Sequence, residues 1–150
     1  MINHLESFLG SGWSMPPLFQ LQSSSYKTGE QEVALATMSG EEKIAESIYT
    51  IINTQPGTFI TRPDFGCDLS QYVFEKLNRS TLNAIERTVA DSLLYYESRI
   101  IVEDTILSIE DAIIGKLQIN VAYQIIQTNS RYNQVFPYYL NEALQPAISI

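Results

Sequence analysis

The side chains that most often perform chemistry in proteins are scarce in this chain, which has one histidine, His4, and one cysteine, Cys67. A Ser-His-Asp or Cys-His site would need His4 brought beside a nucleophile, and a histidine-based metal cluster needs more than one histidine. We expect His4 to be solvated and Cys67 to be a small buried residue rather than a reactive thiol. The stretch Gly10-Ser11-Gly12 lacks the further glycine and the strand–helix setting of a phosphate-binding loop. The sequence therefore predicts no catalytic, cofactor or metal site.

Carboxylates are plentiful, with 17 Asp and Glu residues. A glycosidase needs only two of them, set several ångströms apart. Nothing in the spacing selects a pair, and most acids lie opposite the apolar stripes, where they solvate the surface. A hydrolase stays an alternative, and its acids would come from Glu41, Glu42, Glu46, Asp64, Glu86, Glu97 and Asp104.

The composition limits the classes of partner. A net charge of −8 and a pI near 4.5 argue against a protein that follows nucleic-acid phosphates and against binding to an anionic membrane surface. No run approaches the roughly 18 apolar residues of a membrane span, and no signal peptide is evident. One cysteine permits no intrachain disulfide, which fits synthesis in a reducing cytoplasm. We expect no nucleic-acid partner and no membrane insertion.

The stretch RPDFG predicts a rigid turn. Pro63 restricts Arg62 to an extended conformation, and Gly66 permits backbone angles that other residues resist. Phe65 can then insert into the core. Two interpretations stay open: a structural turn with an ion pair between Arg62 and Asp64, or a rigid turn that presents Arg62 to a partner.

Glu97 and Arg99 lie where a predicted helix gives way to a strand, in the stretch YYESRI. An arginine at this place suits the C-terminal end of a helix dipole. The pair is either a capping charge with a salt bridge or a feature of an interface.

The N-terminal stretch FLGSGWSMPPLF carries large apolar side chains and no charge. Pro16 and Pro17 hold the chain extended and remove two backbone donors, so little conformational entropy is lost on docking. Trp13 and Phe19 are candidate anchors in a partner interface. The alternative is that this stretch folds back on its own domain.

Hydrophobic spacing predicts two main helices. The first begins with a capping box at Ser39 and Glu42 and ends near Asn53. The second is capped by Ser80, and its apolar stripe has steps of three and four. A shorter helix is expected over residues 71–77. The stripe of the second main helix comprises Leu82, Ile85, Val89, Leu93 and Tyr96.

After Ile100 the apolar period changes to two, which predicts strands over residues 100–109 and 116–127. A polar loop over residues 128–134 leads to a final strand over 135–140, in which Pro137 marks an edge or a bulge. A short extended piece is also expected at residues 58–61. In the second strand, Leu117, Ile119, Val121, Tyr123 and Ile125 point to one face.

This order of elements predicts an α+β fold: two main helices packed on one face of a small antiparallel β-sheet, with an extended N-terminal arm. The predicted organisation is a docking arm over residues 1–38, an α+β domain over 39–140 and a C-terminal tail over 141–150. A flexible joint is expected within the arm at residues 22–29.

Five segments, taken in order, resemble the small baseplate-wedge and sheath-initiator family of contractile injection machines. This family includes phage tail wedge proteins and relatives in type VI secretion baseplates and extracellular injection particles. Where the family typically has Glu-Pro-Arg, this chain has Glu97-Ser98-Arg99, which keeps both charges and frees the helix exit. The five segments are FLGSGWSMPPLF, SGEEKIAESIYTIINTQPG, TRPDFGCDL, YESRI and TNSRYNQVFPYYL.

The resemblance implies a structural protein without catalysis, in a sixfold ring at the base of a tail. Such a protein clamps larger wedge subunits around the tube and templates the first sheath ring, which fits strand addition at an open sheet edge. The implied partners are larger wedge proteins, the sheath protein and inner tube or hub proteins. The implied location is the baseplate of a particle assembled in a bacterial cytoplasm.

Two alternatives to this function stay open: a peptidoglycan-cleaving, lysozyme-like glycosidase carried by the particle, and a free-standing regulatory adaptor. The residues expected at partner interfaces are Trp13, Pro16, Pro17, Phe19, Arg62, Asp64, Phe65, Glu97, Arg99, Asn129, Phe136 and Tyr138.

Overall fold

A computed structural model describes residues 9–14, 17–23, 31–111 and 116–139. The chain divides into two compact units, residues 1–47 and 48–150. Among the described residues, no helix is long and apolar enough to cross a bilayer. The predicted limits of the arm, the domain and the tail stay predictions.

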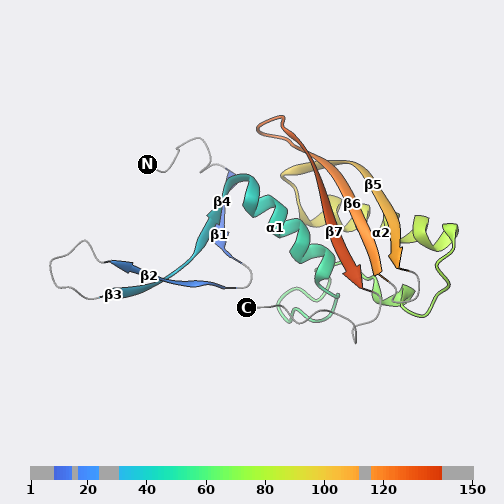
Figure 1. The fold of residues 1–150 in the computed structure, drawn as a ribbon, viewed down its shortest axis with the longest axis horizontal. Coiled ribbons are helices and arrows are strands. Elements are labelled where there is room, and N and C mark those ends of the chain that lie inside the picture. Colours follow the sequence, from blue (N-terminus) through green and yellow to red (C-terminus); the bar gives the residue numbers. More distant parts are fainter. Residues whose placement is uncertain (1–8, 15–16, 24–30, 112–115, 140–150) are drawn as a thin grey trace. The chain divides into compact units, whose positions relative to one another are not determined.

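In the first unit, the strands of the N-terminal arm pair with one another as an antiparallel ribbon (Figure 1). The sequence analysis predicted an extended arm and gave it no partner strands, so this pairing adds to the sequence interpretation. The strands are β1 (Ser11–Trp13) paired with β4 (Thr37–Ser39), and β2 (Phe19–Ser23) paired with β3 (Gln31–Leu35).

The ribbon is interrupted once. Trp13 is opposite Thr37 and Phe19 is opposite Leu35, so on the second strand Ala36 alone separates the two paired stretches. An interruption of this kind removes residues of one strand from the hydrogen-bond ladder.

Ala36 bonds to both ends of the interruption. Its carbonyl accepts the N–H of Ser14 at 3.1 Å, and its own N–H donates to the carbonyl of Leu18 at 2.7 Å. Pro17 therefore lies where the ladder needs no donor, which is the place a strand tolerates proline. Pro16 lies outside the described residues.

Helix α1 (Gly40–Asn53) follows β4 directly and ends where the sequence predicted. Its two glutamates in the first turn suit the positive end of the helix dipole. The predicted apolar stripe is almost fully buried, and it consists of Ile44, Ile48, Ile51 and Ile52.

The second unit contains a three-stranded antiparallel sheet in the order β5-β6-β7. These strands are β5 (Ile100–Asp111), β6 (Lys116–Ile125) and β7 (Arg131–Tyr139). Strand β6 is in the middle and alternates between half-buried and buried residues along its whole length. The prediction of its buried face is confirmed for Leu117, Ile119, Val121, Tyr123 and Ile125.

Helix α2 (Arg79–Tyr96) packs against β5, behind the sheet in the view of Figure 1. Its cap differs from the prediction, because Asn78 and not Ser80 begins the helix. The side-chain oxygen of Asn78 accepts the N–H of Thr81 at 2.9 Å, and Asn78 has the extended backbone of an N-cap. Ser80 already lies within the first turn.

Three loop predictions are wrong. Residues 58–61 form turns, in which Arg62 donates its N–H to the carbonyl of Phe59 at 3.1 Å. Residues 71–77 contain no α-helix; one 3-10 turn covers Ser70–Tyr72. Strand β7 begins at Arg131, inside the predicted polar loop. Its first residues are polar, but they pair with β6, and an edge strand can keep polar side chains in solvent.

The RPDFG turn is held by backbone hydrogen bonds and by one glycine. Gly57 donates its N–H to Pro63 at 2.7 Å, and Cys67 donates to Thr54 at 2.9 Å. Gly66 has φ +122°, and a Cβ atom there would lie 2.1 Å from the Thr54 carbonyl oxygen. Only glycine fits this position without a movement of the backbone.

We predict that Gly66→Ala lowers the free energy of unfolding by about 3 kcal/mol, through strain and the backbone clash. Gly57→Ala is the matched control, because Gly57 has φ +88° and open space around its Cα. Its loss should be about 1 kcal/mol. Urea denaturation measures both values, and equal losses would contradict the role given to the close approach at Thr54.

Candidate functional site: interaction surfaces

The ribbon carries three exposed apolar side chains, called here together the ribbon patch: Trp13, Leu18 and Phe19. Their exposed fractions are 67%, 53% and 70%. Large exposed apolar and aromatic side chains are candidate contacts for a partner. The patch comprises the two anchors predicted from the sequence together with Leu18, which the sequence interpretation missed.

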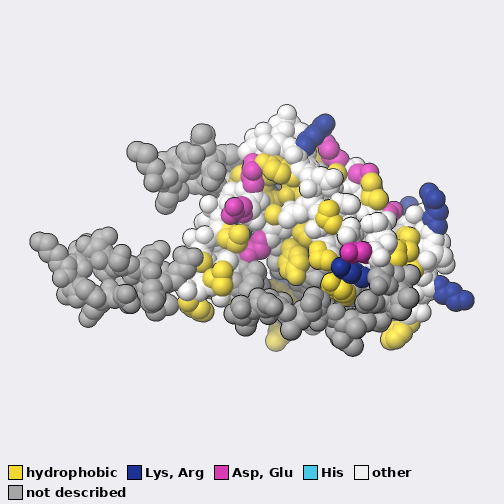
Figure 2. Space-filling view, in the orientation of Figure 1, with side chains coloured by type: hydrophobic (Ala, Val, Ile, Leu, Met, Phe, Trp, Pro, Cys, Tyr) yellow, Lys and Arg dark blue, Asp and Glu magenta, His cyan; other side chains and the backbone are white. Residues whose placement is uncertain are grey.

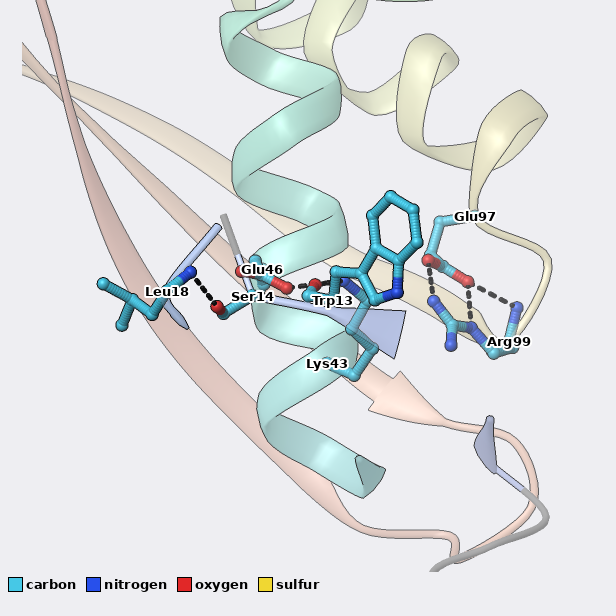
Figure 3. A network of polar contacts seen from close by, with 7 residues as sticks. All are labelled: Trp13, Ser14, Leu18, Lys43, Glu46, Glu97 and Arg99. Carbon is cyan, nitrogen blue, oxygen red and sulfur yellow. Dashed lines mark hydrogen bonds and ion pairs between the residues drawn. The ribbon is translucent and has the colours of Figure 1, made fainter. Parts of the chain in front are cut away.

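Polar contacts fix the backbone beneath the ribbon patch (Figure 3). The Lys43 ammonium donates to the carbonyl oxygen of Trp13 at 2.6 Å and pairs with the Glu46 carboxylate at 2.6 Å. The Ser14 hydroxyl accepts the N–H of Leu18 at 3.2 Å. The backbone at both ends of the interruption in the ribbon therefore has defined hydrogen-bond partners.

The RPDFG turn places Arg62 against aromatic rings. Its guanidinium carbon lies 5.7 Å from the ring centroids of Phe65 and Tyr96, and these two rings meet edge-on at 5.1 Å. The Tyr96 hydroxyl donates to the Asp64 carbonyl oxygen. This arrangement is a cation–π contact on a rigid turn.

Two expectations for this turn are wrong. Among the described residues, Arg62 forms no ion pair with Asp64, because the rings hold its guanidinium instead. Phe65 is half-buried and packs against Tyr96 rather than inserting into the core. Arg62 and Asp64 are both exposed.

Glu97 and Arg99 form a bidentate ion pair at the end of α2 (Figure 3). The Arg99 Nε donates to Glu97 Oε1 at 2.6 Å and its NH2 group donates to Oε2 at 2.5 Å. Glu97 is 4% exposed, and its hydrogen bond raises the pKa of the Arg99 guanidinium. The predicted salt bridge at the helix end is therefore present.

The predicted residues near β7 occupy different environments. Asn129 has φ +56° in the β6–β7 turn, and its side-chain oxygen accepts the amide of Gln124. Phe136 is 3% exposed, with its ring 6.3 Å from that of Tyr49, so it offers almost no surface to a partner. Tyr138 is half-buried on β7.

The sheet has two edges and one outer face. A groove of about 690 Å³ lies between α2 and the β5 edge from Ile100 to Thr105. Glu86 of α2, which also lines the groove, accepts the N–H of Leu107 at 2.9 Å. On the outer face, hydrophobic side chains lie among polar ones in Figure 2, and the half-exposed Ile106 and Val135 flank β6.

Cys67 is buried, as expected, and its burial raises the pKa of the thiol to about 11 despite a hydrogen bond with Ser92. Within the described part of the chain, no three His, Cys, Asp or Glu side chains are placed to hold a metal ion. The sequence interpretation missed Lys43, and it named Glu86 only as a possible hydrolase acid and not as a partner of the Leu107 N–H. The spacing of Lys43 and Glu46 suggests an ion pair, but nothing local indicates a bond to Trp13.

The family model described as "Baseplate wedge protein gp25" matches residues 38–130, more than half of the chain. The chain belongs to the gp25 baseplate wedge family. Baseplate wedge protein gp25 of Enterobacteria phage T4 is 38% identical over 61 residues, a stretch that covers 41% of this chain and 46% of the T4 protein. The match therefore spans about half of that relative.

Two solved structures resemble this wedge-family chain. One, from Geobacter sulfurreducens, is named as a candidate tail lysozyme; it is 41% identical, covers 73% of this chain and 99% of its own, and has a TM-score of 0.67. The other belongs to the sixfold-symmetrised baseplate of the anti-feeding prophage, at 24% identity and a TM-score of 0.59. It covers 93% of this chain and 92% of its own. At this identity, the similarity shows a shared fold alone.

We predict that the Glu97–Arg99 pair of this wedge-family chain is strongly coupled in stability. Glu97→Gln and Arg99→Gln should each lower the free energy of unfolding by about 3 kcal/mol, because each leaves a partly buried charge without its partner. The double variant should lose less than the sum by about 1 kcal/mol or more. Urea denaturation of the four proteins measures the coupling, and additive losses would contradict it.

We predict that native Cys67 resists alkylation by iodoacetamide at pH 8.5, whereas the urea-unfolded chain reacts quickly, because the thiolate reacts and burial disfavours it. Since the folded pKa of about 11 exceeds the ordinary 9.0, the contribution of the neutral thiol to stability is present below pH 9. It is lost as the pH rises through 11.

Mass spectrometry of the labelled protein follows the alkylation, and Cys67→Ala is the control, because it removes this part of the pH dependence of unfolding. Equal alkylation rates in the native and unfolded chains would contradict the burial of the thiol.

Proposed function

We propose that this protein is a structural component of the baseplate of a phage or phage-tail-like particle and acts by holding neighbouring subunits together. The observation that carries the proposal is the match of the gp25 wedge model to residues 38–130. A chain of this kind needs surfaces for partners more than a catalytic cleft. The ribbon patch and the open sheet edges are surfaces of that kind.

The ribbon patch is the proposed docking site for a neighbouring wedge or sheath subunit. Trp13 and Phe19 are large, exposed and carried by a strand, so they can fill pockets on a partner. A two-stranded ribbon is only marginally stable in water without further packing. Docking would supply that packing.

The finer proposal is that a segment of the sheath protein adds a strand to the three-stranded sheet. The β5 edge between Ile100 and Thr105 supports it, because the groove beside α2 gives an added strand a second wall. Towards Leu107 the Glu86 carboxylate already takes an outward N–H. The other edge, β7, contains Pro137, which lacks a donor.

The remaining partner proposals follow from family membership: larger wedge proteins, the inner tube or hub, and a sixfold ring in the assembled particle. Exposed Arg62 and Asp64 on the rigid turn are available to such partners. We propose synthesis in a bacterial cytoplasm followed by incorporation into the baseplate.

A glycosidase is the second candidate, because a 41% identical relative is named as a candidate tail lysozyme. Four acids line the groove beside α2: Glu86, Asp91, Glu103 and Asp104. Three have partners, since Glu86 accepts the Leu107 N–H, Glu103 pairs with Arg131 and Asp104 accepts the Thr105 N–H. A catalytic pair needs two carboxylates aimed at a substrate. Because three of the four carboxylates already have partners in the protein, the groove favours the structural role over the glycosidase.

We predict that Trp13→Ala changes the free energy of unfolding by less than about 1 kcal/mol, because the side chain is exposed, and prevents incorporation into particles. The measurement is a pull-down of tagged protein from the native host, with mass spectrometry for sheath, tube and wedge proteins and negative-stain microscopy of the eluate. Phe74→Ala is the matched control, an aromatic residue of the second unit that is 98% exposed.

Normal incorporation of Trp13→Ala would contradict docking through the ribbon patch. Wild-type protein that comes down alone and releases peptidoglycan fragments in a turbidity assay would favour the glycosidase.

A further inference from the structure

Lys43 contacts the backbone of Trp13, so it can influence the direction in which the exposed indole points. One ammonium group lies 2.6 Å from the Trp13 carbonyl oxygen and 2.6 Å from Glu46 Oε2 (Figure 3). The side chains of Lys43 and Glu46 are only 20% and 9% exposed. The bond to Glu46 is partly buried and the bond to the Trp13 carbonyl is exposed; both are charge-assisted, which makes them stronger than neutral hydrogen bonds.

Gly12 provides the space for the end of the Lys43 side chain. A Cβ atom at Gly12 would lie 2.7 Å from Lys43 Cε, and Gly12 is not among the described glycines with positive φ. The reason for glycine here is therefore the close approach of Lys43 rather than the backbone angle. A Cβ at residue 12 would displace the end of the Lys43 side chain, which is flexible enough to shift, and would so disturb its contact with Trp13.

The need for such a contact follows from the ribbon itself. Two strands alone do not hold a rigid shape in water, and the register beside Trp13 is interrupted. An anchor that is free to move loses more entropy when a partner binds.

We infer that Lys43, seated against Gly12 and paired with Glu46, is a positioning residue that fixes the direction in which Trp13 is presented to a neighbouring subunit. The inference rests on the proposed function, because it takes the ribbon patch as the docking surface. Lys43 itself makes its contact through a backbone carbonyl and leaves the indole exposed. Its effect on assembly is therefore indirect, through the order of the ribbon.

The test uses the only tryptophan of the chain, so the fluorescence anisotropy of the full-length protein reports on Trp13 directly. Lys43→Met keeps an unbranched stem and removes the charge, so anisotropy should fall and incorporation into particles in the native host should drop about tenfold. Lys43→Arg keeps a donor and should retain both. Lys116→Met, which breaks the Glu110–Lys116 ion pair of the sheet, should change neither.

Gly12→Ala gives a second variant, which keeps the lysine and displaces the end of its side chain. It should lower both the anisotropy and the incorporation. In the double variant with Lys43→Met, both values should be no lower than in Lys43→Met alone. Such non-additivity would support one shared contact, because a general loss of fold would add.

Unchanged anisotropy and incorporation in Lys43→Met, together with loss of incorporation in Trp13→Ala, would overturn the positioning role and leave the docking proposal standing. Normal incorporation of Trp13→Ala would overturn both. Failure of Lys43→Arg to retain the wild-type values would also count against the inference, because a donor would remain at the carbonyl.

Discussion

Strand β6 has neighbours on both sides, and the rest of the second unit depends on its alternation. Its inward side chains from Leu117 to Ile125 are at most 2% exposed. A slip of one residue in its pairing would turn this whole row to solvent, so the register with β5 and β7 is strongly specified. The same register leaves an outer face with polar residues on β6 and half-exposed Ile106 and Val135 beside them. Burial on one face thus determines which surface remains for partners.

The parts of the fold that could be predicted are those with a clear apolar period over many residues. Helix α1, the stripe of α2 and the buried face of β6 have such a period, and their burial agrees with it. Strand β7 was predicted too short, because its residues from Arg131 to Gln134 are largely polar and its pairing comes from β6. The cap at Asn78 was missed because Ser80 and Asn78 are both good cap residues, and local sequence does not choose between them.

The candidate surfaces were predictable in composition and not in arrangement. Trp13 and Phe19 stand out as uncharged, aromatic and close to two prolines, which is enough to suggest docking. The pairing of β1 with β4 joins residues 24 to 28 positions apart along the chain, and no local pattern specifies it. The contact between Lys43 and Trp13 depends on that pairing, so it could be recognised only once the ribbon was known. Long-range register is the information that a single sequence carries least clearly.

The end of α2 illustrates how one geometry can be held by different means. A proline at position 98 would restrict the exit from the helix through its ring, and this chain has Ser98 there. The Glu97 carboxylate instead accepts two hydrogen bonds from the Arg99 guanidinium and a further one, at 3.3 Å, from the Arg99 N–H. The N–H of Glu97 also donates to Leu93 at 2.9 Å, so the loop is tied to the helix at the same residue. Because Glu97 is buried, these bonds compete little with water, and they can restrict the path from helix to strand without the proline.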